Sequence, residues 1–146
     1  MRIVVFVVSY GRSIPEKMSK MPYETTIKSF EDYVRAEVDG DRVPGNEVND
    51  AILAGRKMSA ACRDYGASKL LVIFKLTGRL RPTEAYEIFS NPEDFGWSRD
   101  VKVALVDENP VSQEDSTFSE TVAVNRAYDM RVFDNEIEAK DWLLGT

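Results

Sequence analysis

The turn that follows the central apolar run of this sequence has the residue types of an anion site. Two arginines supply positive charge, a glycine lets a ligand approach the backbone closely, and the proline that follows opens a short helix whose N-terminus would favour an anion. Phosphate or carboxylate could bind here, or the second threonine could be phosphorylated. The alternative is that this threonine only caps the helix and both arginines are solvated. The residues are Thr77, Gly78, Arg79, Arg81 and Thr83.

Four aromatic residues follow within and just after that short helix: Tyr86, Phe89, Phe95 and Trp97. Tyr86 and Phe89 are three residues apart, which is typical of one core-facing side of a helix. Phe95 and Trp97 lie in a loop and are the better candidates for a pocket or an interface. Together the four could line an apolar pocket for a lipid-like ligand, or they could simply supply core burial.

A third candidate is an acidic segment without lysine or arginine. Carboxylate oxygens in a loop can hold calcium or magnesium, but the spacing fits no calcium-loop motif and a proline interrupts it. A solvated acidic loop is the simpler interpretation. The carboxylates are those of Asp107, Glu108, Glu114, Asp115 and Glu120.

Composition excludes several kinds of chemistry. The 146 residues contain no histidine and one cysteine, so neither a Ser–His nor a Cys–His pair nor an imidazole metal site can form. A single cysteine cannot form an internal disulfide and fits the cytoplasm. The net charge of −6 argues against nucleic-acid binding. We therefore expect no catalysis, no cofactor and no metal.

The elements that position these candidates alternate along the chain. Apolar residues at intervals of three and four predict a long helix over 46–65, with Cys62 on its buried face and Arg56 and Arg63 opposite, where they could meet an acidic partner or be solvated. Further patterns predict strands over 24–30, 32–39, 70–74, 101–106 and 130–133, and helices over 82–90, 117–126 and 134–144. Ser116 and Asp134 are the expected caps of the last two helices.

This order predicts a single α/β domain, with a mostly parallel sheet of four to five strands, an antiparallel edge and about four helices. Residues 1–20 carry four basic residues and one acidic residue and include a β-branched apolar run, which is too short to span a membrane. These residues could add a strand to the sheet. Alternatively, the translation start could be assigned too early, with the working domain at 21–146.

Residues 21–144 resemble the SpoIIAA-like (STAS-like) family of small bacterial proteins, most recognisably in their second half. The similarity rests on the apolar strands over 69–74 and 101–107, the helix 118–126, and the terminal pattern Phe-Asp…Glu-Ala-x-x-Trp-Leu over 133–143. It implies a small sheet backed by helices, and a role in binding or regulation. Two features depart from the family. The turn at Thr77–Thr83 has no serine to phosphorylate, and no glycine precedes Met130, so that Asp129 is expected in the left-handed conformation.

The resulting expectation is a noncatalytic STAS-like module that binds a protein partner or a second copy of itself. The alternative is a carrier or sensor of a small apolar ligand. For both alternatives we expect a cytoplasmic protein that has no transmembrane segment and no nucleic-acid partner.

Overall fold

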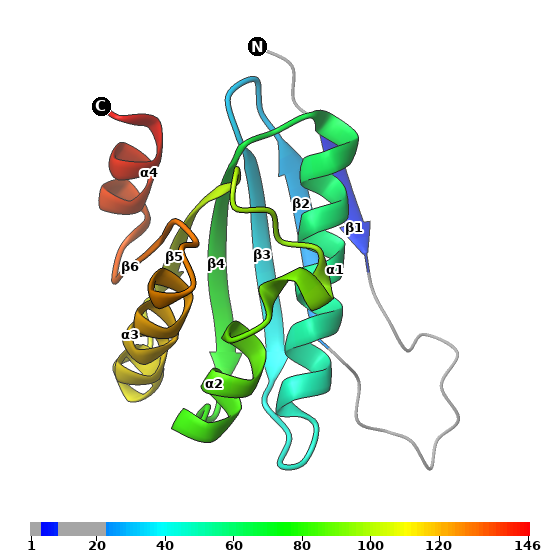
Figure 1. The fold of residues 1–146 in the computed structure, drawn as a ribbon. Coiled ribbons are helices and arrows are strands. Elements are labelled where there is room, and N and C mark those ends of the chain that lie inside the picture. The colour runs from blue at the N-terminus through cyan, green and yellow to red at the C-terminus, as the bar shows by residue number, and fades with distance from the viewer. Residues whose placement is uncertain (1–3, 9–22) are drawn as a thin grey trace.

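The computed structural model describes residues 4–8 and 23–146. The predicted boundary at residue 21, and most of the 1–20 segment, lie outside these residues. One six-stranded sheet runs in the order β1-β2-β3-β4-β5-β6 (Figure 1). Its strands are β1 (Val4–Val8), β2 (Glu24–Ser29), β3 (Val34–Asp41), β4 (Lys69–Thr77), β5 (Lys102–Asp107) and β6 (Met130–Phe133). β1 pairs antiparallel with β2 and β2 with β3, whereas β3 to β6 are parallel neighbours.

The helices are α1 (Glu47–Tyr65), α2 (Pro82–Phe89), α3 (Pro110–Asn125) and α4 (Glu136–Leu144), with a short 3₁₀ helix η2 (Pro92–Phe95) after α2. The predicted α/β class, the mostly parallel sheet with its antiparallel edge and the four helices are confirmed. β1 adds a strand to the antiparallel edge of the five that follow.

The two faces of the sheet are covered unequally. Alternate residues of β4 point to opposite faces, so that Leu70 and Val72 pack with α1 while Leu71 and Ile73 pack with α4. The larger core cluster joins the sheet to α1, α2, η2 and the end of α3. The smaller one contains only α4 and its neighbours on the other face. The larger apolar core therefore lies on the α1 side of the sheet.

α1 is set by its small and apolar residues. Ala54, Gly55, Ala61 and Cys62 are buried against the sheet, and the helix ends at Gly66, whose φ of 63° provides the left-handed cap that the sequence predicts.

Three local predictions are wrong. α3 begins at Pro110 rather than at residue 117, because the Asn109 side chain caps it by accepting from the Val111 amide. Asn135, not Asp134, caps α4 in the same way through the Glu138 amide.

The left-handed residue after α3 is Ala127, with a φ of 66°, rather than Asp129. The Ala127 amide donates to the carbonyl of Val124, and the next amide, that of Tyr128, donates to the carbonyl of Ala123. These bonds close the last turn of the helix at that position, which places the turn two residues earlier than expected.

Candidate functional site

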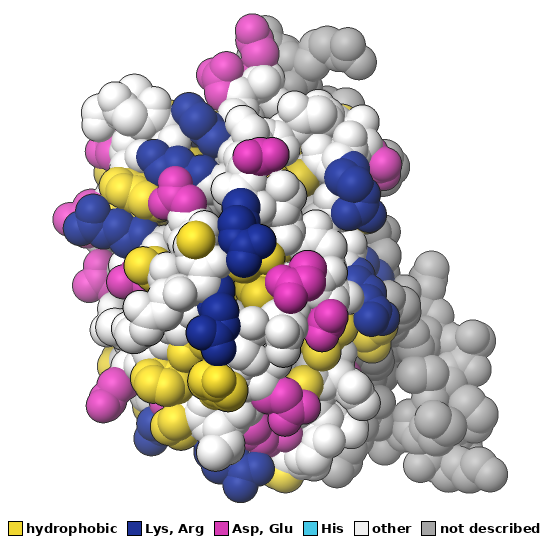
Figure 2. Space-filling model, viewed as in Figure 1, with side chains coloured by type: hydrophobic (Ala, Val, Ile, Leu, Met, Phe, Trp, Pro, Cys, Tyr) yellow, Lys and Arg dark blue, Asp and Glu magenta, His cyan; other side chains and the backbone are white. Residues whose placement is uncertain are grey.

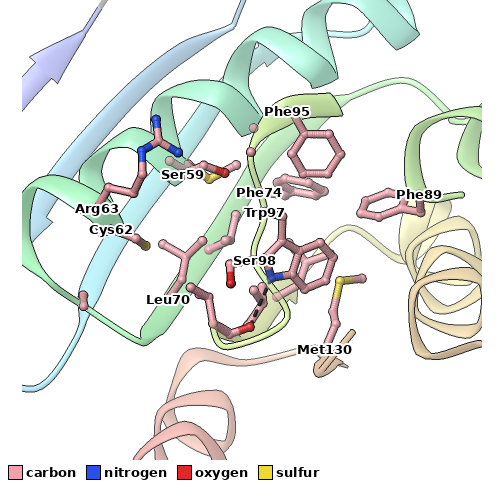
Figure 3. Close-up of a pocket in the computed structure, with 18 of the residues that line it drawn as sticks. Ser59, Cys62, Arg63, Leu70, Phe74, Phe89, Phe95, Trp97, Ser98 and Met130 are labelled. Atoms are coloured by element: carbon pink, nitrogen blue, oxygen red, sulfur yellow. Dashed lines mark hydrogen bonds between the residues drawn. The ribbon is translucent and has the colours of Figure 1, made fainter. Parts of the chain in front are cut away.

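An apolar pocket of about 310 Å³, which we call the main cavity, lies between α1 and the sheet (Figure 3). Its floor is the first half of β4 and β5, and its wall is the segment that follows α2 and runs through η2 to the start of β5. The floor side chains are those of Leu70, Val72, Phe74, Val103 and Leu105. The pocket thus lies toward the amino ends of these parallel strands.

The aromatic wall of the cavity makes several contacts with neighbouring residues. The Trp97 indole packs on Tyr128 with ring centroids 4.6 Å apart, and its Nε1 donates to the carbonyl of Val101 at 3.1 Å. The Tyr128 hydroxyl donates in turn to Glu93 at 2.9 Å, and the Arg99 guanidinium lies 4.5 Å from the centroid of the Tyr128 ring. The polar atoms of both Trp97 and Tyr128 are therefore satisfied, as is usual for buried rings of these types.

Gly55 allows Phe95 to reach the inside of the cavity. A Cβ at Gly55 would lie 2.6 Å from Cδ1 and 2.9 Å from Cγ of the Phe95 ring, closer than any real contact. Phe95 also meets Phe89 edge-on, at 6.4 Å between centroids. The glycine in the middle of α1, which costs helix stability, is therefore required by the packing of this aromatic side chain.

The lining of the cavity includes few polar side chains. Arg63, Ser59 and Ser98 line the cavity, and we call these three the polar rim (Figure 3). A Cβ at Gly96 would come within 3.0 Å of Arg63 Nη1 and 3.3 Å of Ser59 Cβ, so that the glycine makes room for the rim.

Cys62 lies within the cavity wall. Burial raises the pKa of its thiol to about 11, although nearby Arg63 acts in the opposite direction. A thiol held protonated in this way is a weak nucleophile at neutral pH.

A second, smaller cavity of about 80 Å³ continues the first toward the carboxyl ends of the strands. The two share lining residues, among them Met58, Phe74, Phe89 and Phe95. Movement of the Phe89 and Phe95 rings would therefore lengthen the first cavity.

The predicted aromatic set divides at the helix α2. Phe89, Phe95 and Trp97 line the main cavity, whereas Tyr86 is 53% exposed on the outer side of α2. There its hydroxyl accepts from Arg126 Nη2 at 3.1 Å. Figure 2 shows apolar side chains gathered over α2 and α3, where Tyr86 and Phe118 are exposed.

The two arginines of the predicted anion turn are already paired with carboxylates of α3 and α2. Arg79 makes two hydrogen bonds to Asp115, at 2.7 and 3.0 Å, and the Leu80 amide donates to the same carboxylate. Arg81 pairs with Glu84 at 2.9 Å. These arginine hydrogen bonds lower the pKa of both Asp115 and Glu84.

The other residues of the predicted turn have separate surroundings. Gly78, with a φ of 83°, turns the chain against Arg42, and the Thr77 hydroxyl donates to Asp41. Thr83 is exposed in the first turn of α2.

The acidic segment is distributed among separate contacts. Asp107 is buried at the end of β5 and accepts from the Ser112 and Ser116 hydroxyls, at 2.9 and 2.7 Å, and from the Asn109 amide. Asp115 pairs with Arg79, as above, and Glu120 accepts from the Val132 amide at 2.6 Å. Within residues 4–8 and 23–146, no group of three or more acidic or cysteine side chains could hold a metal ion.

Sequence reasoning missed the contribution of α1 to the cavity. Gly55, Met58, Cys62 and Arg63 all line it, although Arg63 was predicted to face away from the core. The one available signal was Gly55, an isolated glycine within a strongly helical pattern, which often marks a close approach.

No protein-family model, curated protein or solved structure matches this chain. The resemblance to SpoIIAA-like proteins therefore stays a prediction. None of the helices in the described part of the chain is long and apolar enough to cross a membrane.

Proposed function

We propose that this domain is a noncatalytic binding module whose main cavity holds a small apolar ligand. The observation that supports this most is the cavity itself, about 310 Å³ and lined almost entirely by aliphatic and aromatic side chains. Ligand sites commonly have volumes of about 300–1,000 Å³ and are mostly apolar with a few polar groups. An engineered apolar cavity of about 150 Å³ takes benzene, so about twice that volume suits a chain of roughly eight to twelve carbons or two fused rings.

A noncatalytic role fits the contents of the cavity. Cys62 is its one thiol among the described residues, and a raised pKa keeps that thiol protonated at neutral pH. The sequence has no histidine to act as its base. Binding to a protein partner or to a second copy stays a prediction from the sequence and is independent of this cavity.

The test uses a neutral fluorescent probe, N-phenyl-1-naphthylamine, with the full chain carrying Trp142→Phe. This leaves Trp97, in the cavity wall, as the only tryptophan. Saturable quenching of Trp97 with energy transfer to the probe is the expected result. Absence of saturable binding by this probe and by aliphatic alcohols of eight to twelve carbons would overturn the proposal.

A matched pair of substitutions locates the binding. Val101→Phe enlarges a half-buried side chain that lines the cavity, whereas Val111→Phe makes the same change at a 59% exposed valine of α3. We expect Val101→Phe to weaken probe binding about tenfold and Val111→Phe to leave it unchanged. Equal effects of the two variants would place the probe elsewhere.

A further inference from the structure

We infer that the natural ligand is an amphiphile with a carboxylate head group, which pairs with Arg63 while its apolar part fills the main cavity. This inference rests on the proposed function and specifies the class of ligand. It follows from the distribution of charge around the cavity.

Arg63 is the one charged side chain that lines the main cavity among the residues the structure describes, and no carboxylate lines it there. In the same described part of the chain, no ion pair involves Arg63. The arginines of the turn after β4 differ, since Arg79 and Arg81 are each paired with a carboxylate. A cation at the edge of apolar space is complementary to an anionic group on an apolar body.

The surroundings of Arg63 suit a head group. The side chain is exposed, so its guanidinium remains hydrated until a ligand arrives. Ser59 and Ser98 lie on the same rim and carry hydroxyl donors, and Ser98 Oγ already accepts from the Asp100 amide at 3.2 Å. Because a carboxylate offers about four acceptor sites, it can use a guanidinium and a hydroxyl together.

Arg63 also has a local role in the helix, which the test must separate from ligand binding. A cation in the last turn of α1 offsets the negative end of the helix dipole. Loss of stability in an Arg63 variant therefore says nothing about the ligand. The ratio of the affinities for two ligands that differ only in the head group does not depend on this loss of stability.

The experiment measures displacement of N-phenyl-1-naphthylamine by octanoate and by 1-octanol, at pH 7.5 and low salt. The proteins compared are the unmodified chain, Arg63→Gln, and Arg56→Gln as a control. Arg56 is exposed on the same helix, seven residues earlier, and does not line the cavity. We expect Arg63→Gln to weaken the binding of octanoate about three- to tenfold, as for a partly exposed charge pair. The affinity for octanol should change by less than about twofold.

Added salt gives a second readout. Raising NaCl to about 0.5 M should weaken octanoate binding by the unmodified chain and by Arg56→Gln, because salt screens the charge pair. Octanoate binding by Arg63→Gln, which lacks the pair, should change little. The inference is overturned if Arg63→Gln leaves octanoate unchanged while octanol still displaces the probe. If neither compound displaces the probe and the probe itself does not bind, the proposed function fails as well.

Discussion

The two ends of the parallel strands use their polar residues in opposite ways. At the carboxyl ends, where ligands usually bind in open α/β sheets, Arg79 is paired with Asp115 and Asp107 with the hydroxyls of Ser112 and Ser116. At the amino ends the floor is apolar, the cavity is open, and Arg63 has no carboxylate partner among the described residues. The difference indicates that a charge near a strand end is available to a ligand only where the fold leaves that charge unpaired.

The largest effect should come from the carboxyl end. Asp107→Ala removes the shared acceptor of Ser112, Ser116 and the Asn109 amide and leaves buried donors unsatisfied. We expect it to lower the free energy of unfolding by about 3 kcal/mol or more. Urea denaturation at pH 7 measures this loss.

Asp107→Asn keeps one carbonyl acceptor, so its free energy of unfolding should fall by less than that of Asp107→Ala. In the fraction that remains folded, probe binding at the amino end should be unchanged. An Asp107→Ala protein as stable as the unmodified chain would show that this end of the sheet is not held by the buried carboxylate.

The next effect concerns the amino end. Gly55→Ala would ordinarily stabilise an exposed helix by about 1 kcal/mol, but here the added methyl overlaps the Phe95 ring. We expect a net loss of about 1–2 kcal/mol, the usual cost of overpacking, together with weaker probe binding because Phe95 is displaced in the cavity. Thermal unfolding and Trp97 fluorescence measure the two quantities.

The double variant Gly55→Ala/Phe95→Leu supplies the control, since a smaller side chain relieves the overlap. The loss of stability in the double variant should be smaller than the sum of the losses in the two single variants, as is usual for residues in contact. Strict additivity would contradict the close contact on which the shape of the cavity depends.

The smallest effect is a pH dependence at the carboxyl end. Hydrogen bonding to Arg79 holds the pKa of Asp115 below its ordinary value of 3.8. A carboxyl whose pKa is lower in the folded state stabilises the protein above its unfolded pKa, and this stabilisation is lost as the pH falls through the folded value. Arg79→Ala should therefore be less stable than the unmodified chain at pH 7, and the difference should shrink below about pH 4.

Urea midpoints from pH 7 to pH 3 measure that difference. Arg56→Ala is the matched control, because the Arg56 side chain donates to the Asp94 carbonyl and not to a carboxylate. Its effect should change little with pH. A gap between Arg79→Ala and the unmodified chain that stays constant to pH 3 would contradict the role given to Asp115.

Much of the fold was predictable because apolar periodicity sets it. The centres of β4 and β5, residues 70–74 and 103–106, are continuous apolar runs, and α1 was predicted to within a residue because its buried side has a regular spacing. The start of α3 was not predictable in this way. Its buried residues there are Ser112, Asp115, Ser116 and Ser119, so that the helix buries polar groups and has no apolar stripe.

The site was predictable only in part, for a similar reason. Phe95 and Trp97 stood out as aromatic residues in a loop, and both line the cavity. Whether Arg79 or Arg63 has a carboxylate beside it depends on residues more than thirty positions away in the sequence, such as Asp115. No local pattern carries that information, since only the folded chain brings these side chains together.

The contact between Glu120 and the Val132 amide has a consequence for assembly. β6 is the last strand of the sheet and pairs only with β5 among the described strands. An exposed edge amide is a template on which a further strand can add. Here the carboxylate of α3 accepts from that amide at 2.6 Å, so an incoming strand would have to displace a charged group. If two copies of this chain associate, growth of one continuous sheet across β6 is therefore the disfavoured route.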